Sequence, residues 1–153
     1  MYDVIVVGAR CAGSPLSMLL ARMGYRVLLV DRATFPSDTI STQYIWLSGT
    51  ACLHRWGLLD RLRATNCPPV REVGIDLGAF SLKGTPPPMD GVTEMFCPRR
   101  TILDKLLIDA AAEAGAEVEQ ASPSRDSCRA TAESPESGDT SGTAQKSRRA
   151  PKS

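Results

Sequence analysis

The 153-residue sequence has little of what builds a metal site, a disulfide framework or a membrane span. It contains one histidine, His54, and its five cysteines are widely spaced, with no CxxC pair. One histidine cannot build a metal site, and an odd number of scattered cysteines is typical of reduced thiols. No apolar run is long enough for a transmembrane helix, and the apolar residues 4–7 are too few for a signal-peptide core. We therefore expect a cytoplasmic protein without an integral membrane segment or a bound metal.

Large apolar residues are also absent from the end of the chain. Residues 121–153 contain no Val, Ile, Leu, Met, Phe, Trp or Tyr. Such a segment cannot bury enough apolar surface to offset the entropy lost on ordering, so we predict a disordered polar tail. Its small basic excess leaves contact with nucleic acid open. A solvated tail is the favoured interpretation, and we expect no nucleic-acid partner.

The first 120 residues, in contrast, alternate between strand-like and helix-like segments. The segments nearest the N-terminus predict a strand, a helix and a second strand, at residues 2–7, 13–23 and 26–30. The strands are apolar runs suited to burial in a parallel sheet, and Leu16, Leu19 and Leu20 are expected on the packed face of the helix. Gly24 is expected to end this helix. This order is that of a βαβ unit with a right-handed crossover.

Further elements are predicted along the rest of this region. Residues 46–64 suit one or two short helices broken at Gly57, and residues 100–114 have the 3/4 apolar spacing of a strong helix. Additional strands are expected at residues 70–77, 80–83, 92–96 and 116–119.

A glycine turn joins the first predicted strand to the first helix. It reads Gly8-Ala9-Arg10-Cys11-Ala12-Gly13. Gly8 permits a tight turn, Gly13 permits close approach of helix and strand, and the backbone N–H groups at the helix start can face a pyrophosphate. Together with the βαβ order, the turn predicts an α/β protein with a partial Rossmann-type fold. Residues 1–120 form the N-terminal part of an FAD/NAD(P)-binding domain in this interpretation, and residues 121–153 form the tail.

Two side chains bear on which dinucleotide this turn accepts. Asp31 lies at the end of the second strand, where a carboxylate accepts hydrogen bonds from ribose hydroxyls and repels a 2′-phosphate, which disfavours NADP. Arg10 replaces the second glycine of the usual pattern. Its side chain either points away, helps to neutralise the pyrophosphate, or blocks binding; the sequence leaves these alternatives open.

Two stretches of the chain resemble a known family. YDVIVVGARCAGSPLSMLLARMGYRVLLVDRATFPSDTIST and CPRRTILDKLLIDAAAEAGAEV are similar to FAD-dependent oxidoreductases of the p-hydroxybenzoate hydroxylase and geranylgeranyl reductase type. Within them the chain looks most like the bacterial group that carries GARCAGS. The second stretch contains the Arg-x-x-Leu-Asp-x-x-Leu pattern of the family, at Arg100, Leu103, Asp104 and Leu107.

The resemblance implies FAD as cofactor and assigns roles to individual residues. Asp31 would bind the adenosine ribose, Arg32 would lie beside the adenine, and Arg100 would contact the cofactor. The segment of residues 36–42, which includes Ser41 and Thr42, would approach the flavin end. The turn residues would bind the pyrophosphate or lie against it: Gly8, Ala9, Arg10, Cys11, Ala12, Gly13 and Ser14.

Each of these roles has a plainer alternative. Arg32 is also explained as a surface charge, and Ser41 and Thr42 as ordinary loop residues. A basic Arg100 at a helix start is disfavoured by the helix dipole, which favours a functional reason for it. Cys11 is interpreted as a small buried packing residue rather than as a redox group.

The expected function is that of a flavin-dependent monooxygenase or reductase of a small organic substrate. The resemblance also implies NAD(P)H as electron donor. No catalytic acid, base or nucleophile is assigned, and neither is an oligomeric state. The alternatives are a non-catalytic remnant and an NAD-binding fragment.

The chain departs from the family after Val118, where a polar string begins. The later Asp-Gly motif, the Gly-Asp motif and the substrate-domain sheet of the family do not follow. We therefore expect an N-terminal third of a larger enzyme, as a frameshifted or truncated reading frame would produce. An uninterrupted gene with this stop codon would exclude the frameshift.

Overall fold

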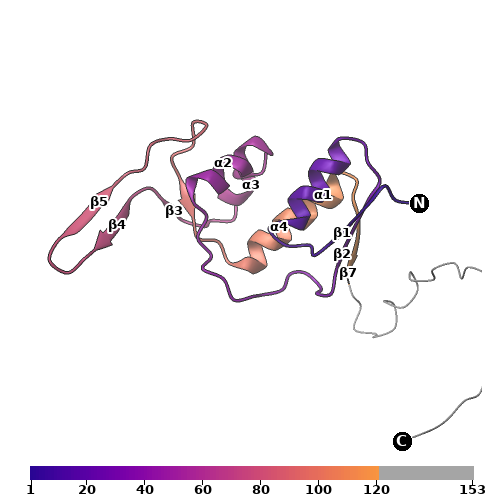
Figure 1. Ribbon diagram of the computed structural model, residues 1–153, viewed down its shortest axis with the longest axis horizontal. Helices are drawn as coiled ribbons and strands as arrows, with labels where there is room; N and C mark the ends of the chain where they lie inside the picture. Colours follow the sequence, from indigo (N-terminus) through magenta and orange to yellow (C-terminus); the bar gives the residue numbers. More distant parts are fainter. Residues whose placement is uncertain (121–153) are drawn as a thin grey trace, which may run out of the picture. The chain divides into compact units, whose positions relative to one another are not determined.

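A three-stranded parallel sheet organises the part of the chain that the computed structural model describes, residues 1–120 (Figure 1). Its strands are β1 (Val4–Val7), β2 (Val27–Asp31) and β7 (Glu117–Gln120), in the order β1-β2-β7. Val4 pairs with Val27, and Leu28 pairs with Glu117. The predicted α/β class, βαβ start and parallel sheet are confirmed. The predicted disordered tail lies outside the described residues.

Two helices connect these strands and pack against each other. α1 (Gly13–Arg22) joins β1 to β2, and α4 (Arg100–Glu113) precedes β7. Gly24 follows α1 with a φ of +90°, as expected for the glycine that ends a helix. The predicted helix boundaries therefore differ from the observed ones by one residue at most.

The buried face of α1 differs from the predicted one. Ser14, Ser17 and Met18 are buried, whereas the side chain of Leu16 is 49% exposed. Leu19 and Leu20 are only partly buried. The prediction placed the large apolar residues on the buried face, but two small serines lie on it instead.

The first strand is also less buried than predicted. Val6 belongs to the core, but Ile5 and Val7 are 58% and 83% exposed. Alternate residues of a strand point to opposite faces of a sheet. Within residues 1–120, the face of β1 that carries Ile5 and Val7 is therefore uncovered, and the sheet is not buried on both sides.

The segment between β2 and α4 forms smaller elements. α2 (Leu47–Arg55) and α3 (Leu59–Arg63) are separated at Gly57, as predicted. β3 (Pro69–Val70) pairs with β6 (Met95–Phe96), and β4 (Val73–Asp76) forms an antiparallel hairpin with β5 (Ser81–Gly84). The predicted strand 70–77 is thus divided into two strands that belong to different sheets.

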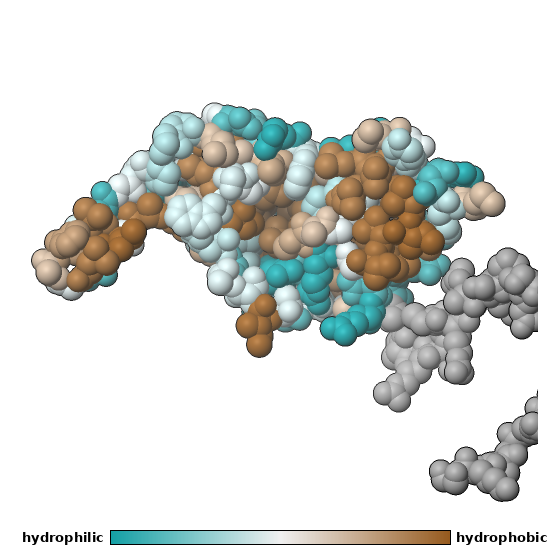
Figure 2. All heavy atoms as spheres, in the orientation of Figure 1, coloured by the Kyte–Doolittle hydropathy of each residue, from teal (hydrophilic) through white to brown (hydrophobic). Residues whose placement is uncertain are grey.

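The hairpin of β4 and β5 carries apolar side chains on its surface, and they appear brown over these strands in Figure 2. Ile75 pairs with Leu82 across the hairpin. Both side chains are more than half exposed, as are Leu77 and Phe80. The core lies elsewhere, around Met18, Leu29, Leu62, Met95 and Phe96.

Replacing Gly13 by alanine tests the packing of α1 against β1. A Cβ at this position would lie 1.8 Å from the carbonyl oxygen of Gly8, so backbone must move. We expect Gly13→Ala to lower the free energy of unfolding by about 3 kcal/mol in urea denaturation. Gly84→Ala is the control, because a Cβ there has no neighbour within 4 Å, and it should change stability by less than about 0.5 kcal/mol. Equal free energies of unfolding for the two variants would contradict the close contact between Gly13 and the Gly8 carbonyl oxygen.

Candidate cofactor site

The glycine turn between β1 and α1 has the backbone geometry that its two glycines predict. Gly8 has a φ of +102°, a conformation that L side chains rarely adopt, and its N–H donates to the Val30 carbonyl at 2.7 Å. Gly13 lies so close to Gly8 that no side chain fits between them. The start of α1 is therefore held directly above the end of β1.

Three consecutive backbone N–H groups in this turn remain available. Within residues 1–120, the N–H groups of Arg10, Cys11 and Ala12 find no acceptor on another residue. The preceding N–H, that of Ala9, donates to Asp31. Unpaired N–H groups at the start of a helix bind phosphate oxygens well, because the helix dipole adds to their own polarity.

Two buried hydroxyls lie in the first turns of α1. Ser14 and Ser17 are 0% exposed, and their Oγ atoms have no hydrogen-bond partner within the described part of the chain. Buried polar atoms are normally paired. The free N–H groups and the glycine contact that a Cβ would fill together fit a pyrophosphate at this turn.

Asp31 connects the end of β2 to the same turn. Its Oδ2 accepts the N–H of Ala9 at 2.7 Å, and its Oδ1 accepts the N–H of Ala33 at 2.8 Å. A carboxylate oxygen can accept more than one hydrogen bond, so both oxygens retain acceptor capacity for a ribose hydroxyl. The structure therefore gives Asp31 a second role, that of fixing the turn.

Asp104 of α4 forms the centre of a polar cluster beside the turn. Its side chain is 0% exposed. Its Oδ2 accepts Nη1 of Arg10 at 2.6 Å, its Oδ1 accepts Nε of Arg100 at 3.0 Å, and the Cys11 thiol lies 3.3 Å from Oδ1. Two guanidinium groups thus share one carboxylate, which leaves the cluster with one net positive charge.

The Arg10 side chain also reaches the loop after β2. Its Nη2 donates to Ser37 Oγ at 2.8 Å, and its guanidinium carbon lies 5.2 Å from the centre of the Phe35 ring. Both terminal nitrogens therefore have acceptors in the protein. Of the alternatives left open by the sequence, a side chain directed into the protein is the one that matches this geometry.

The remaining predicted residues lie outside this cluster. Arg32 is exposed, and within residues 1–120 it has no ion pair. Ser41 Oγ accepts the N–H of Gln43 at 3.2 Å, and Thr42 is exposed. The structure brings Arg10, Cys11, Arg100 and the turn together, whereas the roles of Arg32, Ser41 and Thr42 stay predictions.

Sequence reasoning assigned no role to Asp104 or Phe35, and it placed Ser37 only within the segment 36–42 that is expected to approach the flavin end. A signal for Asp104 was available, because it follows Arg100 by four residues and adjoins the buried Leu103. A carboxylate on the apolar face of a helix needs a partner. No comparable signal marked Ser37 or Phe35 as a partner of Arg10.

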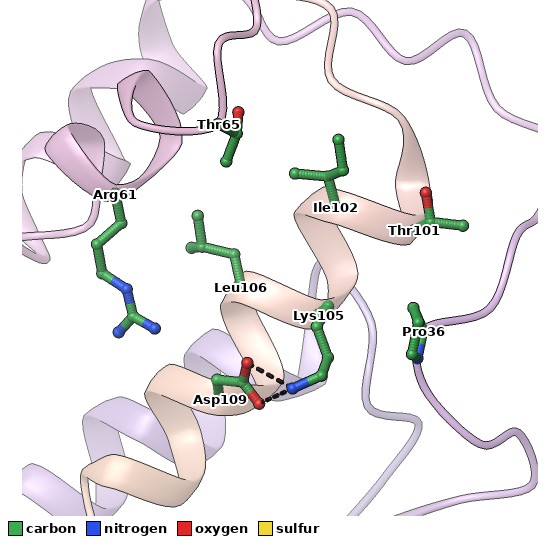
Figure 3. A pocket seen from close by; sticks show the side chains of 8 residues that line it. All are labelled: Pro36, Arg61, Thr65, Thr101, Ile102, Lys105, Leu106 and Asp109. Atoms are coloured by element: carbon green, nitrogen blue, oxygen red, sulfur yellow. Dashed lines mark hydrogen bonds and ion pairs between the residues drawn. The ribbon is translucent and has the colours of Figure 1, made fainter.

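An open groove of about 500 Å³ lies beside α3 and α4 (Figure 3). Lys105 and Asp109 form an ion pair in it, with Nζ 2.6 Å from Oδ2. No residue of the glycine turn lines the groove, so it is distinct from the turn, although Pro36 of the predicted segment 36–42 does line it. Its lining residues are Pro36, Arg61, Thr65, Thr101, Ile102, Lys105, Leu106 and Asp109.

Residues 1–120 contain neither a candidate membrane span nor a metal-binding cluster. No helix there is both long and apolar enough to cross a membrane. The described residues contain no group of three His, Cys, Asp or Glu side chains able to hold a metal ion.

The environment of Cys11 raises the pKa of its thiol to about 11. Desolvation contributes most, followed by the negative charge of Asp104, and Arg100 opposes them. At pH 8 only about one molecule in a thousand would carry the thiolate. Cys11 is thus a hydrogen-bond donor to Asp104 rather than a ready nucleophile. The residue is exposed, so its predicted role as a buried packing residue is wrong.

Site-resolved alkylation with iodoacetamide tests this arrangement. We expect the rate at Cys11 to rise about tenfold per pH unit between pH 8 and pH 10, because only the thiolate reacts. Asp104→Asn should accelerate alkylation at pH 8, since it removes the negative charge beside the sulfur. Asp109→Asn on the same helix, the matched control, should not. A rate that levels off below pH 9 would contradict the raised pKa.

Comparison with known proteins supports the same cofactor. A family model described as FAD binding domain matches residues 1–141. The chain is 33% identical over 120 residues to digeranylgeranylglycerophospholipid reductase 2 of Methanothermobacter thermautotrophicus, covering 76% of the chain and 29% of that protein. It is 33% identical over 119 residues to a menaquinone reductase of Mycolicibacterium smegmatis, covering 76% of the chain and 28% of that protein.

Solved structures share the fold. A flavoprotein/dehydrogenase from Cytophaga hutchinsonii matches with a TM-score of 0.68 at 26% identity, over 77% of this chain and 30% of that one. The myxobacterial chondrochloren halogenase CndH, an FAD-dependent halogenase, matches with a TM-score of 0.69 at 24% identity, over 78% of this chain and 28% of that one. The chain spans less than a third of the length of these proteins. It belongs to the FAD binding domain family, which confirms the resemblance predicted from the GARCAGS turn and the Arg100 helix.

Proposed function

We propose that this chain binds the FAD pyrophosphate at the turn of residues 8–13 and supplies this part of the cofactor site of a flavin-dependent oxidoreductase. The observation that carries the proposal is the set of three available N–H groups at Arg10, Cys11 and Ala12. They lie where Gly8 and Gly13 bring the start of α1 against the end of β1.

Individual residues have distinct parts in this proposal. Arg10 contributes its backbone N–H, since its guanidinium is bound to Asp104 and Ser37. Arg100 is 14% exposed and faces the cofactor with the donors that Asp104 leaves free. Asp31 accepts from the adenosine ribose while it holds Ala9 in place. Ser14 is proposed to lie against the pyrophosphate at the start of α1.

The remaining turn residues act through backbone or packing. Ala9 and Ala12 keep the turn narrow, and Cys11 offers its N–H. Arg32 is proposed to lie beside the adenine, and Ser41 and Thr42 to approach the flavin end. Bound flavin supplies the redox chemistry, and the residues of this chain bind and orient it.

For the complete enzyme we propose reduction of an unsaturated organic substrate with NAD(P)H as electron donor, in the cytoplasm. Two sequence relatives at 33% identity carry reductase names, which supports reduction over monooxygenation. The halogenase likeness, at 24% identity, bears on the fold alone. NAD in the turn is the second candidate, because Asp31 suits the ribose of either dinucleotide.

Ligand titration of the purified chain discriminates between the two dinucleotides. FAD at 100 times its dissociation constant should add about 2.7 kcal/mol to the free energy of unfolding and raise the melting temperature. We expect NAD and NADP at the same concentration to leave the melting temperature unchanged. Stabilisation by NAD but not by FAD would support the second candidate, and no stabilisation by any of them would contradict dinucleotide binding.

Asp31→Asn tests the ribose contact. The amide replaces one acceptor oxygen by an NH2 donor, which faces either the N–H of Ala9 or that of Ala33, and it removes the negative charge that strengthens a hydrogen bond from a ribose hydroxyl. We expect an affinity loss of about tenfold for FAD by fluorescence titration. Asp60→Asn is the matched control, because Asp60 lies exposed on α3 and pairs with Arg63. Equal affinities of the two variants would argue against the placement of the adenosine.

A further inference from the structure

The turn of this chain contains a long cationic side chain where the usual pattern has glycine. That glycine lets a pyrophosphate approach the backbone closely. Arg10 therefore has to place its guanidinium away from the three available N–H groups. The contacts that hold the Arg10 guanidinium away from these N–H groups therefore determine whether a pyrophosphate can reach them.

We propose that Asp104 is the positioning residue that keeps the turn open, by holding the Arg10 guanidinium against α4. This inference rests on the proposed binding of FAD at the turn. The Nη1–Oδ2 distance is 2.6 Å, between residues 94 positions apart in the chain. The pair thus ties the turn to a helix that is remote in sequence.

Burial makes this contact hard to break. The Asp104 side chain is 0% exposed, while that of Arg10 is 28% exposed. A buried carboxylate that loses a cationic partner is strongly destabilised, because water cannot replace the lost hydrogen bond. Arg100 occupies the other oxygen, Oδ1. Each arginine therefore has its own carboxylate oxygen, and Arg100 does not displace Arg10.

The loop after β2 fixes the plane of the same guanidinium. Ser37 Oγ accepts Nη2, and the Phe35 ring lies 5.2 Å from the guanidinium carbon. A planar cation with acceptors at both ends and a ring against its face has little freedom to rotate. Three segments, the turn, the loop and α4, thus define one orientation for Arg10.

A double-mutant cycle in FAD affinity tests this role, with fluorescence titration of the full chain. Asp104→Asn should weaken FAD binding about tenfold, because the released guanidinium competes for the space over the turn. In the Arg10→Gly background, which restores the usual glycine, the same substitution should cost less than about threefold. This rescue separates positioning from a general loss of structure.

Two outcomes overturn the role of Asp104 while FAD binding itself stands. One is an equal loss from Asp104→Asn in both backgrounds, which would mark a structural residue. The other is tighter FAD binding by Asp104→Asn, which would mean that Asp104 competes with the pyrophosphate for Arg10. A parent chain that binds no FAD would instead overturn the proposed function, and this role with it.

Arg10→Gly alone keeps the test decisive if Asp104→Asn fails to fold. Asp104 retains Arg100 as a partner in this variant. We expect its FAD affinity to stay within about fivefold of that of the parent chain, because a partly exposed charge that does not touch the ligand contributes little. A much larger loss would show that the Arg10 side chain is a direct phosphate contact and would overturn the proposal.

Discussion

The candidate site depends on the buried carboxylate of Asp104. It joins residues that are separate in the chain, namely Arg10 and Cys11 of the glycine turn and Arg100 at the start of α4. Through Arg10 it also reaches Ser37. Since an unpaired buried charge is costly, the carboxylate and its two guanidinium partners constrain each other's positions. The same pairing explains how a basic Arg100 is tolerated at a helix start, where the dipole disfavours it.

The glycine turn supplies the other half of the site, through backbone alone. Gly8 and Gly13 bring α1 close to β1, and the N–H groups of Arg10, Cys11 and Ala12 between them have no acceptor on another residue within residues 1–120. Asp31 then secures Ala9 from the neighbouring strand. Backbone geometry offers the phosphate contacts, and the cluster on α4 controls the one side chain that could obstruct them. Membership of the FAD binding domain family is consistent with a pyrophosphate site built from backbone N–H groups at this turn.

Local patterns predicted much of this architecture. Strand, glycine turn, helix and strand were foreseen because each depends on neighbours in sequence, and Gly8 and Gly13 have the geometry expected of them. Leu16 was misplaced because apolar periodicity cannot show that serines lie on the buried face of a helix. The partners of Arg10 were not foreseen because they lie on a different helix and a loop. Family resemblance found Asp104 but gave it no role.

The central claim is that the FAD pyrophosphate binds at the turn of residues 8–13 while Arg10 stays on Asp104. A crystal structure of the chain with FAD tests it most directly. The account predicts phosphate oxygens within hydrogen-bond distance of the N–H groups of Arg10, Cys11 and Ala12, with the Arg10–Asp104 pair intact. A pyrophosphate bound elsewhere, such as in the groove beside Arg61 and Lys105, or an Arg10 side chain turned onto the phosphates, would contradict it.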